Sequence, residues 1–133
     1  MNDRTLKRRK IKSFYKKFYE KISCEYNLPN NIHLKLIFLD SSQTSTHGSF
    51  CVGGYKYSNF EPVIKINFYR EIEDIKRTII HEFCHAINYY HINNNSHPRP
   101  THDKTFWGLC KKFGLRKCDY YKTTQIMKQV WSR

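Results

Sequence analysis

The sequence of 133 residues lacks any stretch that could cross a membrane or direct secretion. Its most apolar segment, IHLKLIFL at residues 32–39, is too short to span a bilayer and contains His33 and Lys35. The first ten residues, MNDRTLKRRK, are charged, and no apolar stretch follows them as it would in a secretory signal. We therefore expect an intracellular protein, in the cytoplasm or associated with the nucleus or nucleoid, with no membrane partner.

The sequence also lacks Cys-x-x-Cys pairs, and it has no Gly-rich phosphate-binding loop. A structural zinc ribbon needs such cysteine pairs, so we expect none. The cysteines are scattered and odd in number, which argues against a disulfide framework and for reduced thiols. They are Cys24, Cys51, Cys84, Cys110 and Cys118.

Acidic residues are scarce: 11 stand against 24 Lys or Arg, which gives a net charge of +13. The excess lies at the two ends, because residues 1–29 hold nine basic and three acidic residues and residues 104–133 hold eight and one. Residues 30–103 hold seven of each. Lys-rich helices can simply be solvated, but two basic flanks on one small domain favour a polyanion, most simply nucleic acid, with single-stranded DNA among the candidate partners. The candidate phosphate contacts are Lys7, Arg8, Arg9, Lys10, Lys111 and Lys112.

Hydropathy patterns predict a single α+β domain over residues 1–133, which we expect to be monomeric. Apolar residues at helical spacing predict a basic N-terminal helix over about 4–26 and a second helix over about 71–90. Alternation predicts a strand in NIHLKLIFLD and a hairpin within FCVGGYKYSNFEPVIKINFY, together a small antiparallel sheet. A last helix is predicted over about 101–113, and a basic tail over about 115–133 stays unassigned.

The second predicted helix contains His81-Glu82-x-x-His85, the pattern of a helical zinc site. On a helix, His81 and His85 point about 40° apart, so both imidazoles can reach one ion. Glu82 is close enough to contact a zinc-bound water without being a ligand. Zinc lowers the pKa of that water to about 7, and Glu82 would act as its general base. Cys84 points elsewhere and is expected to be a small buried hydrophobe.

A catalytic zinc needs three protein ligands, and no Glu follows Glu82 that could be the third. His91 is one candidate, since with Asn88 it gives the spacing H-E-x-x-H-x-x-N-x-x-H, close to a metzincin motif. That arrangement requires the helix to turn at Asn88. Ile87 and Tyr90 continue the apolar stripe, however, so we expect the helix to run on and to carry His91 away.

His102 is the preferred third ligand, because it opens the last predicted helix on the face that must pack on the core. It lies four residues before Phe106, on the side of the helix that also holds Leu109. His97 precedes Pro98 in a loop, and Asp103 is the remaining alternative. The sequence thus predicts His81, His85 and His102 as Zn²⁺ ligands, with Glu82 as the catalytic residue.

The segments IIHEFCHAINYY and HDKTFWGLCKKFG together resemble the SprT-like zinc metallopeptidases, the family of the Spartan-type DNA–protein crosslink proteases. His81, Glu82, His85 and Ala86 match the first part of the family motif, and His102 and Phe106 match the second. The hairpin segment is also similar, so the resemblance covers about residues 10–115. Asp103 stands where the family usually has Gly, which leaves the local turn open.

The resemblance implies a minimal zincin-like fold and a zinc endopeptidase that cleaves proteins bound or crosslinked to DNA. Two alternatives stay open. The first is a zinc peptidase unrelated to DNA, with basic ends that serve solubility. The second is a non-enzymatic nucleic-acid-binding protein with a structural metal, although such a site has no use for Glu82.

Overall fold

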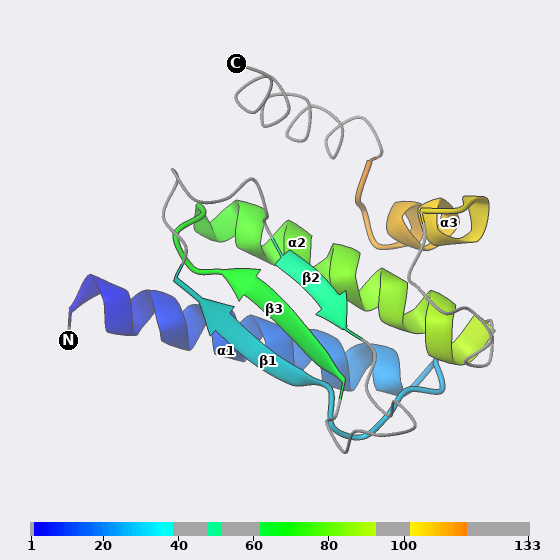
Figure 1. Ribbon diagram of the computed structural model, residues 1–133, viewed down its shortest axis with the longest axis horizontal. Coiled ribbons are helices and arrows are strands. Elements are labelled where there is room, and N and C mark those ends of the chain that lie inside the picture. Colours follow the sequence, from blue (N-terminus) through cyan, green and yellow to red (C-terminus); the bar gives the residue numbers. More distant parts are fainter. Residues whose placement is uncertain (1, 39–47, 52–61, 93–101, 117–133) are drawn as a thin grey trace.

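The computed structural model describes residues 2–38, 48–51, 62–92 and 102–116 of the chain (Figure 1). It has an α+β architecture in which helices and a small sheet form two layers. The elements follow in the order α1 (Asp3–Ser23), β1 (His33–Ile37), β2 (Gly48–Cys51), β3 (Val63–Asn67), α2 (Ile72–Ala86), the π-helical segment η1 (Ile87–Ile92) and α3 (Lys104–Lys112). No helix among the described residues is long and apolar enough to cross a membrane.

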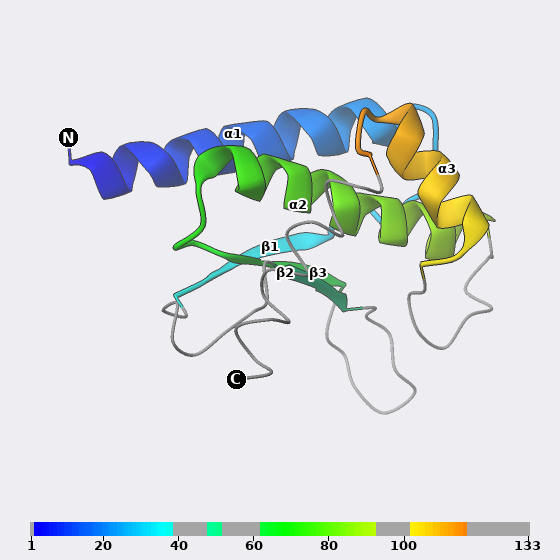
Figure 2. The same ribbon diagram turned by 90° about the horizontal axis from the view of Figure 1, so that it is seen from above.

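Helix α1 confirms the predicted N-terminal helix to within a few residues. The Asn2 side chain caps its start by accepting a hydrogen bond of 2.8 Å from the Thr5 N–H. Its buried stripe recurs at helical spacing and consists of Ile11, Tyr15, Phe18 and Ile22. Rings of this stripe contact Phe83 of α2, which is why α1 and α2 lie side by side over one face of the sheet (Figure 2).

The sheet is mixed, so the prediction of an antiparallel sheet is wrong for one of its two pairings. Strands β2 and β3 pair antiparallel as expected, with Phe50 opposite Ile64. The strand order is β1-β3-β2, however, and β1 pairs parallel to β3. Strand β3 takes the centre because its Ile64 and Ile66 are completely buried beneath the helices, whereas β1 exposes His33 and Lys35.

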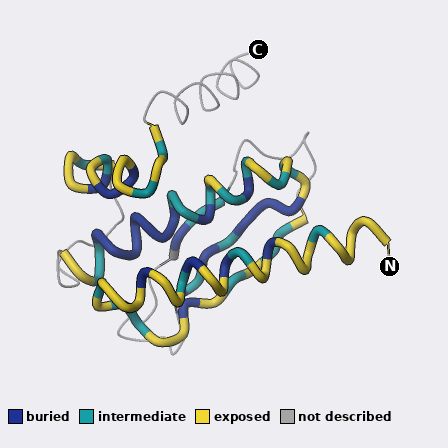
Figure 3. The backbone as a smooth tube through the Cα atoms, turned by 180° about the vertical axis from the view of Figure 1, so that it is seen from behind, coloured by how far each residue is buried: buried dark blue, intermediate teal, exposed yellow. Residues whose placement is uncertain are grey.

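Two lysines that the sequence suggested as phosphate contacts bind atoms of the protein itself. The Lys7 ammonium donates to the carbonyls of Phe68 and Arg70, at 2.5 Å and 2.8 Å, and so ties α1 to the segment before α2. The Lys112 ammonium donates to Tyr26 Oη and to a Glu25 carboxylate oxygen, at 2.7 Å and 3.2 Å. These contacts join both basic flanks to the fold and leave the other cations of α1 to face solvent (Figure 3).

Candidate metal centre

Helix α2 brings His81 and His85 together through its own geometry. Their ring centroids are 5.0 Å apart. His85 is buried, and the side chain of His81 is 12% exposed. The helix keeps this position because Ile75, Ile79 and Phe83 fill the core on the opposite side. The pair therefore points from the core toward the end of the molecule where α3 lies.

His102 joins this pair from the start of α3. Its ring centroid lies 5.2 Å from that of His81 and 4.8 Å from that of His85. One ligand nitrogen from each of the three histidines lies within 4.8 Å of the others. His102 is the exposed member of the set, so the cluster opens to solvent on the side of α3. Among the described residues this is the group of side chains that could hold a metal ion.

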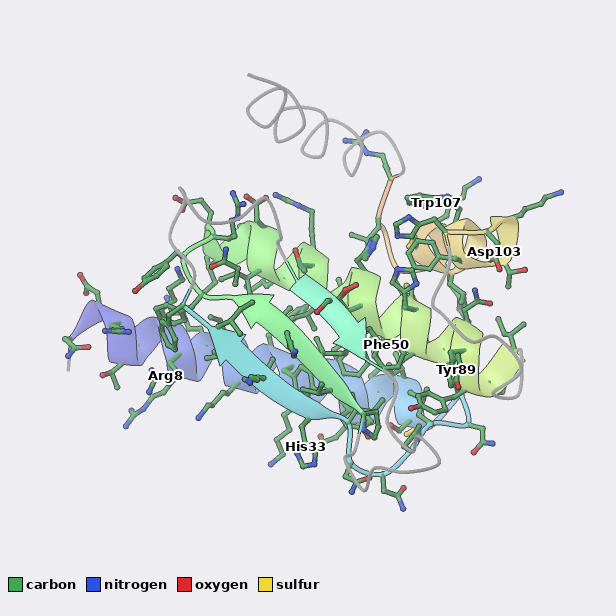
Figure 4. The ribbon with its side chains drawn as sticks, viewed as in Figure 1. Arg8, His33, Phe50, Tyr89, Asp103 and Trp107 are labelled. Atoms are coloured by element: carbon green, nitrogen blue, oxygen red, sulfur yellow. The ribbon has the colours of Figure 1, made fainter. Side chains whose placement is uncertain are left out.

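Phe106 forms the floor beneath the three imidazoles. It is completely buried, and its ring stacks on His85 with a centroid distance of 4.1 Å and an interplanar angle of 19°. Its centroid is 4.9 Å from that of His81 and 5.0 Å from that of His102. Trp107 packs against His102 at 5.5 Å (Figure 4). The sequence predicted Phe106 on the buried face of α3 but gave no role to Trp107.

His91 does not reach this cluster. The helix runs on past Asn88 as the π-helical segment η1, as the apolar stripe predicted. The imidazole of His91 is exposed, and its Nδ1 accepts a hydrogen bond of 2.8 Å from the Asn27 N–H. Its ring packs edge-on against Tyr26. The metzincin-like spacing is therefore not used, while His97 and His47 lie outside the described residues.

Asp103 is the N-cap of α3 rather than a member of the metal cluster. Its Oδ1 accepts a hydrogen bond of 2.8 Å from the Phe106 N–H, the usual bond of an N-cap aspartate. The backbone of Asp103 is extended, with φ −80° and ψ −180°, so the position does not require glycine. The departure from the family pattern noted above thus fits the local turn.

Asn88 links this cap to the helix that carries the other two histidines. It is buried, and its Nδ2 donates to both carboxylate oxygens of Asp103, at 3.1 Å and 3.3 Å. This contact fixes the start of α3, and therefore His102, against the end of α2. Sequence reasoning missed the pair, although an aspartate three residues before a buried aromatic is a recognisable cap signal.

The Asn88–Asp103 contact leads to a testable prediction. We expect Asn88→Ala to lower the affinity for Zn²⁺ by about 10- to 100-fold, the usual effect of losing an interaction that orients a ligand. Asn67→Ala is the matched control, because Asn67 is also buried and its Oδ1 accepts a bond from the Tyr69 N–H. Chelator competition measures both affinities. Equal affinities in the two variants would show that the contact does not position His102.

Cys84 and Cys110 lie behind the cluster and are not ligands in this arrangement. Both are buried, which confirms the expectation for Cys84. A side-chain hydrogen bond with Cys110 and burial both raise the pKa of the Cys84 thiol. A thiol held in its neutral form is a poor metal ligand, because metals bind the thiolate. The pair therefore acts as apolar packing between α2 and α3.

Burial favours the neutral form of His85 and His102. It lowers the pKa of His85 to about 2, with smaller contributions from the charges of His81 and His102, and it also lowers the pKa of His102. Neutral imidazole has the free lone pair that a metal ion needs. In addition, His85 Nδ1 is buried without a hydrogen-bond partner among the described residues.

Glu82 lies beside the cluster in a dry environment. Only 4% of the residue is exposed, and burial raises the pKa of its carboxyl to about 8. One carboxylate oxygen, Oε1, is 3.9 Å from His81 Nε2. The other, Oε2, is buried and has no hydrogen-bond partner among the described residues. A cation held by the histidines and the water that it brings would satisfy both Glu82 and His85.

The donor set fits a borderline divalent ion. Three imidazoles suit zinc, copper, iron or nickel and do not suit magnesium or calcium, which prefer oxygen ligands. Nitrogens bound tetrahedrally to zinc lie about 3.3 Å apart. The nitrogens here lie within 4.8 Å, so small side-chain rotations are enough to bind one ion. Comparisons with protein-family models, curated proteins and solved structures give no match to this chain.

Proposed function

We propose that the protein is a zinc-dependent endopeptidase of the SprT-like type, acting on proteins bound or crosslinked to DNA. The observation that carries the proposal is the convergence of His81, His85 and His102 beside the buried carboxyl of Glu82. Support for the family is the order of the elements, in which the helix of the motif is followed by α3, with His102 directly before the N-cap Asp103. The α+β fold and the mixed sheet are compatible with a minimal zincin-like domain.

In this proposal the three histidines hold Zn²⁺ and Glu82 moves the proton. Bound zinc would supply an acidified water and a Lewis acid for the scissile carbonyl. Glu82 would accept the proton of the attacking water and deliver it to the leaving amine. The buried Glu82 carboxyl is placed for this double task, because its Oε1 lies 3.9 Å from His81 Nε2 at the edge of the cluster.

A structural metal site is the less favoured alternative. Structural zinc sites are closed by four protein ligands and have no use for a buried acid at their edge. Here the described residues provide three ligands, and the exposed His102 leaves one side of the cluster open. Burying the Glu82 carboxyl also destabilises the fold, and a purely structural metal site gives no functional reason to keep an acid there.

The DNA part of the proposal rests on charge. Exposed cations line the polar face of α1; they include Arg9, Lys10, Lys16, Lys17 and Lys21. The net charge of +13 would attract a phosphate backbone over several ångströms. A zinc peptidase unrelated to DNA remains the second candidate, since a basic surface also serves solubility.

The decisive experiment digests two substrates, a DNA-binding protein and casein, with and without single-stranded DNA. We expect zinc-dependent cleavage of the DNA-binding protein that increases when DNA is present and stops with a chelator. Casein controls for general stimulation, because it does not bind DNA. Equal, DNA-independent cleavage of both proteins would favour the second candidate, and no cleavage by the zinc-loaded protein would contradict the enzyme.

A further inference from the structure

Far from the metal centre, three aromatic rings and three cations form a cluster where the start of α1 meets the ends of β1 and β3. We name it the aromatic platform; its residues are Arg4, Lys7, Arg8, Phe38, Phe68 and Tyr69. Arg8 lies at one end of the molecule, and Asp103 and Trp107 lie at the other (Figure 4). Helix α2 spans this separation, and its rise of about 1.5 Å per residue puts the platform about 20 Å from His85.

The rings of the platform pack on one another yet stay partly open to solvent. The Phe38 centroid lies 4.9 Å from that of buried Phe68 and 5.9 Å from that of Tyr69. Phe38 is 38% exposed and Tyr69 is 53% exposed, and they are two of the four large apolar side chains most exposed in the described residues. Phe68 anchors the cluster to the core, so the two outer rings are held rather than free to turn.

Two arginines lie over the ring of Phe38. The guanidinium carbon of Arg4 lies 4.8 Å from the Phe38 centroid, and that of Arg8 lies 5.7 Å from it. Both arginines are exposed. Lys7 differs, since its ammonium is bound to two carbonyls and serves the fold. Arg4 and Arg8 lie on the same side of α1 as the buried residues Ile11 and Tyr15. Near the start of the helix this side is basic, and its two arginines lie over the Phe38 ring.

We infer that the aromatic platform binds single-stranded DNA. Unpaired bases present flat faces that can stack on the exposed ring of Tyr69, which Phe38 supports from behind. Arg4 and Arg8 lie over Phe38 and are placed to bind the phosphates beside such a base. Duplex DNA keeps its bases paired and stacked inside, so it could use the arginines but not the rings. This inference rests on the proposed function, because it names the partner surface that would bring DNA-bound proteins to the metal centre.

The first test measures binding of dye-labelled single-stranded oligothymidine by fluorescence anisotropy, with a duplex of equal length alongside. We expect Tyr69→Ala and Phe38→Ala each to weaken single-strand binding by about tenfold, within the usual contribution of one stacked base. Duplex binding should change little. Tyr69→Phe should bind like the wild type, because it keeps the ring, and Leu6→Ala controls for loss of an exposed apolar side chain on α1.

The second test addresses the arginines. Arg4→Gln with Arg8→Gln should reduce the salt slope for single strands by about 1.4, which is two phosphate contacts of about 0.7 each. Lys35→Gln with Lys104→Gln is the matched control, since it removes two exposed charges that lie outside both α1 and the platform. A platform that is only a structural cluster would show equal slopes in the two double variants.

Three outcomes would overturn the inference. The first is single-strand affinity within twofold of the wild type in both Tyr69→Ala and Phe38→Ala. The second is a duplex that binds as tightly as the single strand and is weakened by the same variants. The third is binding to anionic phospholipid vesicles that the platform variants abolish while DNA binding persists. Each platform variant should keep wild-type zinc affinity. A negative result for DNA binding at the platform can therefore be told apart from a negative result for the proposed zinc peptidase.

Discussion

Glu82→Gln is expected to lose proteolysis while keeping zinc. Removing a general base typically lowers the rate by about 10²- to 10⁴-fold, and glutamine cannot accept the proton. The substitution preserves the shape of the side chain, so the histidines keep their positions. Cleavage rate and zinc content should be measured on the same preparation. A Glu82→Gln protein that cleaves at the wild-type rate would rule out the role proposed for this residue.

Glu73→Gln is the matched control for this variant. Glu73 lies on the same helix, but it is exposed and pairs with the exposed Lys76 at 3.6 Å. Its replacement makes the same chemical change on a solvated surface, where ion pairs contribute little. We expect wild-type cleavage and wild-type zinc content. Loss of activity in both variants would point to a general effect of charge on α2 rather than to proton transfer by Glu82.

Glu82→Gln should also stabilise the metal-free chain. Burial raises the pKa of Glu82 from 4.5 to about 8, so the folded state keeps the carboxyl protonated at pH values where the unfolded chain ionises it. Stability is therefore lost as pH rises from 4.5 toward 8, by about 1.4 kcal/mol per unit. Near pH 7, which is 2.5 units above 4.5, Glu82→Gln should raise the free energy of unfolding by about 3.5 kcal/mol. A stability difference that does not grow between pH 5 and pH 8 would contradict this account.

His102→Ala is expected to abolish tight zinc binding. It removes one of three ligands, so the loss should exceed the roughly 100-fold that changes around a ligand can cause. Because His102 is exposed, truncating its side chain should lower the stability of the fold little, which circular dichroism can verify. Zinc content after dialysis and chelator competition both report the result. Full zinc affinity in this variant would place the third ligand elsewhere.

His91→Ala is the control that separates the two possible third histidines. It removes the same side chain from the continuation of the same helix, and it costs the hydrogen bond to the Asn27 N–H, worth about 1 kcal/mol. We expect full zinc content and a slightly lowered melting temperature. Loss of zinc in His91→Ala with retention in His102→Ala would reverse the assignment and restore the metzincin-like spacing.

The helices could be predicted from the sequence because their information is local. Ile11, Tyr15, Phe18 and Ile22 repeat at the helical period, and the structure buries all four. The continuation of the helix past Asn88 followed from Ile87 in the same way. The convergence of the three histidines could be predicted too, since the helix after His102 must turn its apolar face to the core. The predicted start of that helix at about residue 101 is too early, because Asp103 caps α3 and His102 lies just before it.

The order of the strands could not be predicted, because it depends on which distant segments pair. Alternation identifies β1 and β3 as strands but carries no information on which neighbour each one takes. The Asn88–Asp103 contact and the Lys7 bonds were missed for the same reason, since both join segments that meet only in the folded chain. The predicted hairpin turn and the basic tail lie outside the described residues.

The π-helical segment after Ala86 has a consequence for how this chain tolerates insertions and deletions. Hydrogen bonds in a π-helix span five residues instead of four, so the segment holds more residues per turn than α2 does. The side chains of this segment therefore point in different directions around the helix axis from those that a continued α-helix would give them. Deleting one residue from Ile87–Ile92 would rotate the following side chains of the segment by somewhat less than the roughly 100° per residue of an α-helix and leave the two histidines in place. The length of this segment is thus as much a part of the site as its composition.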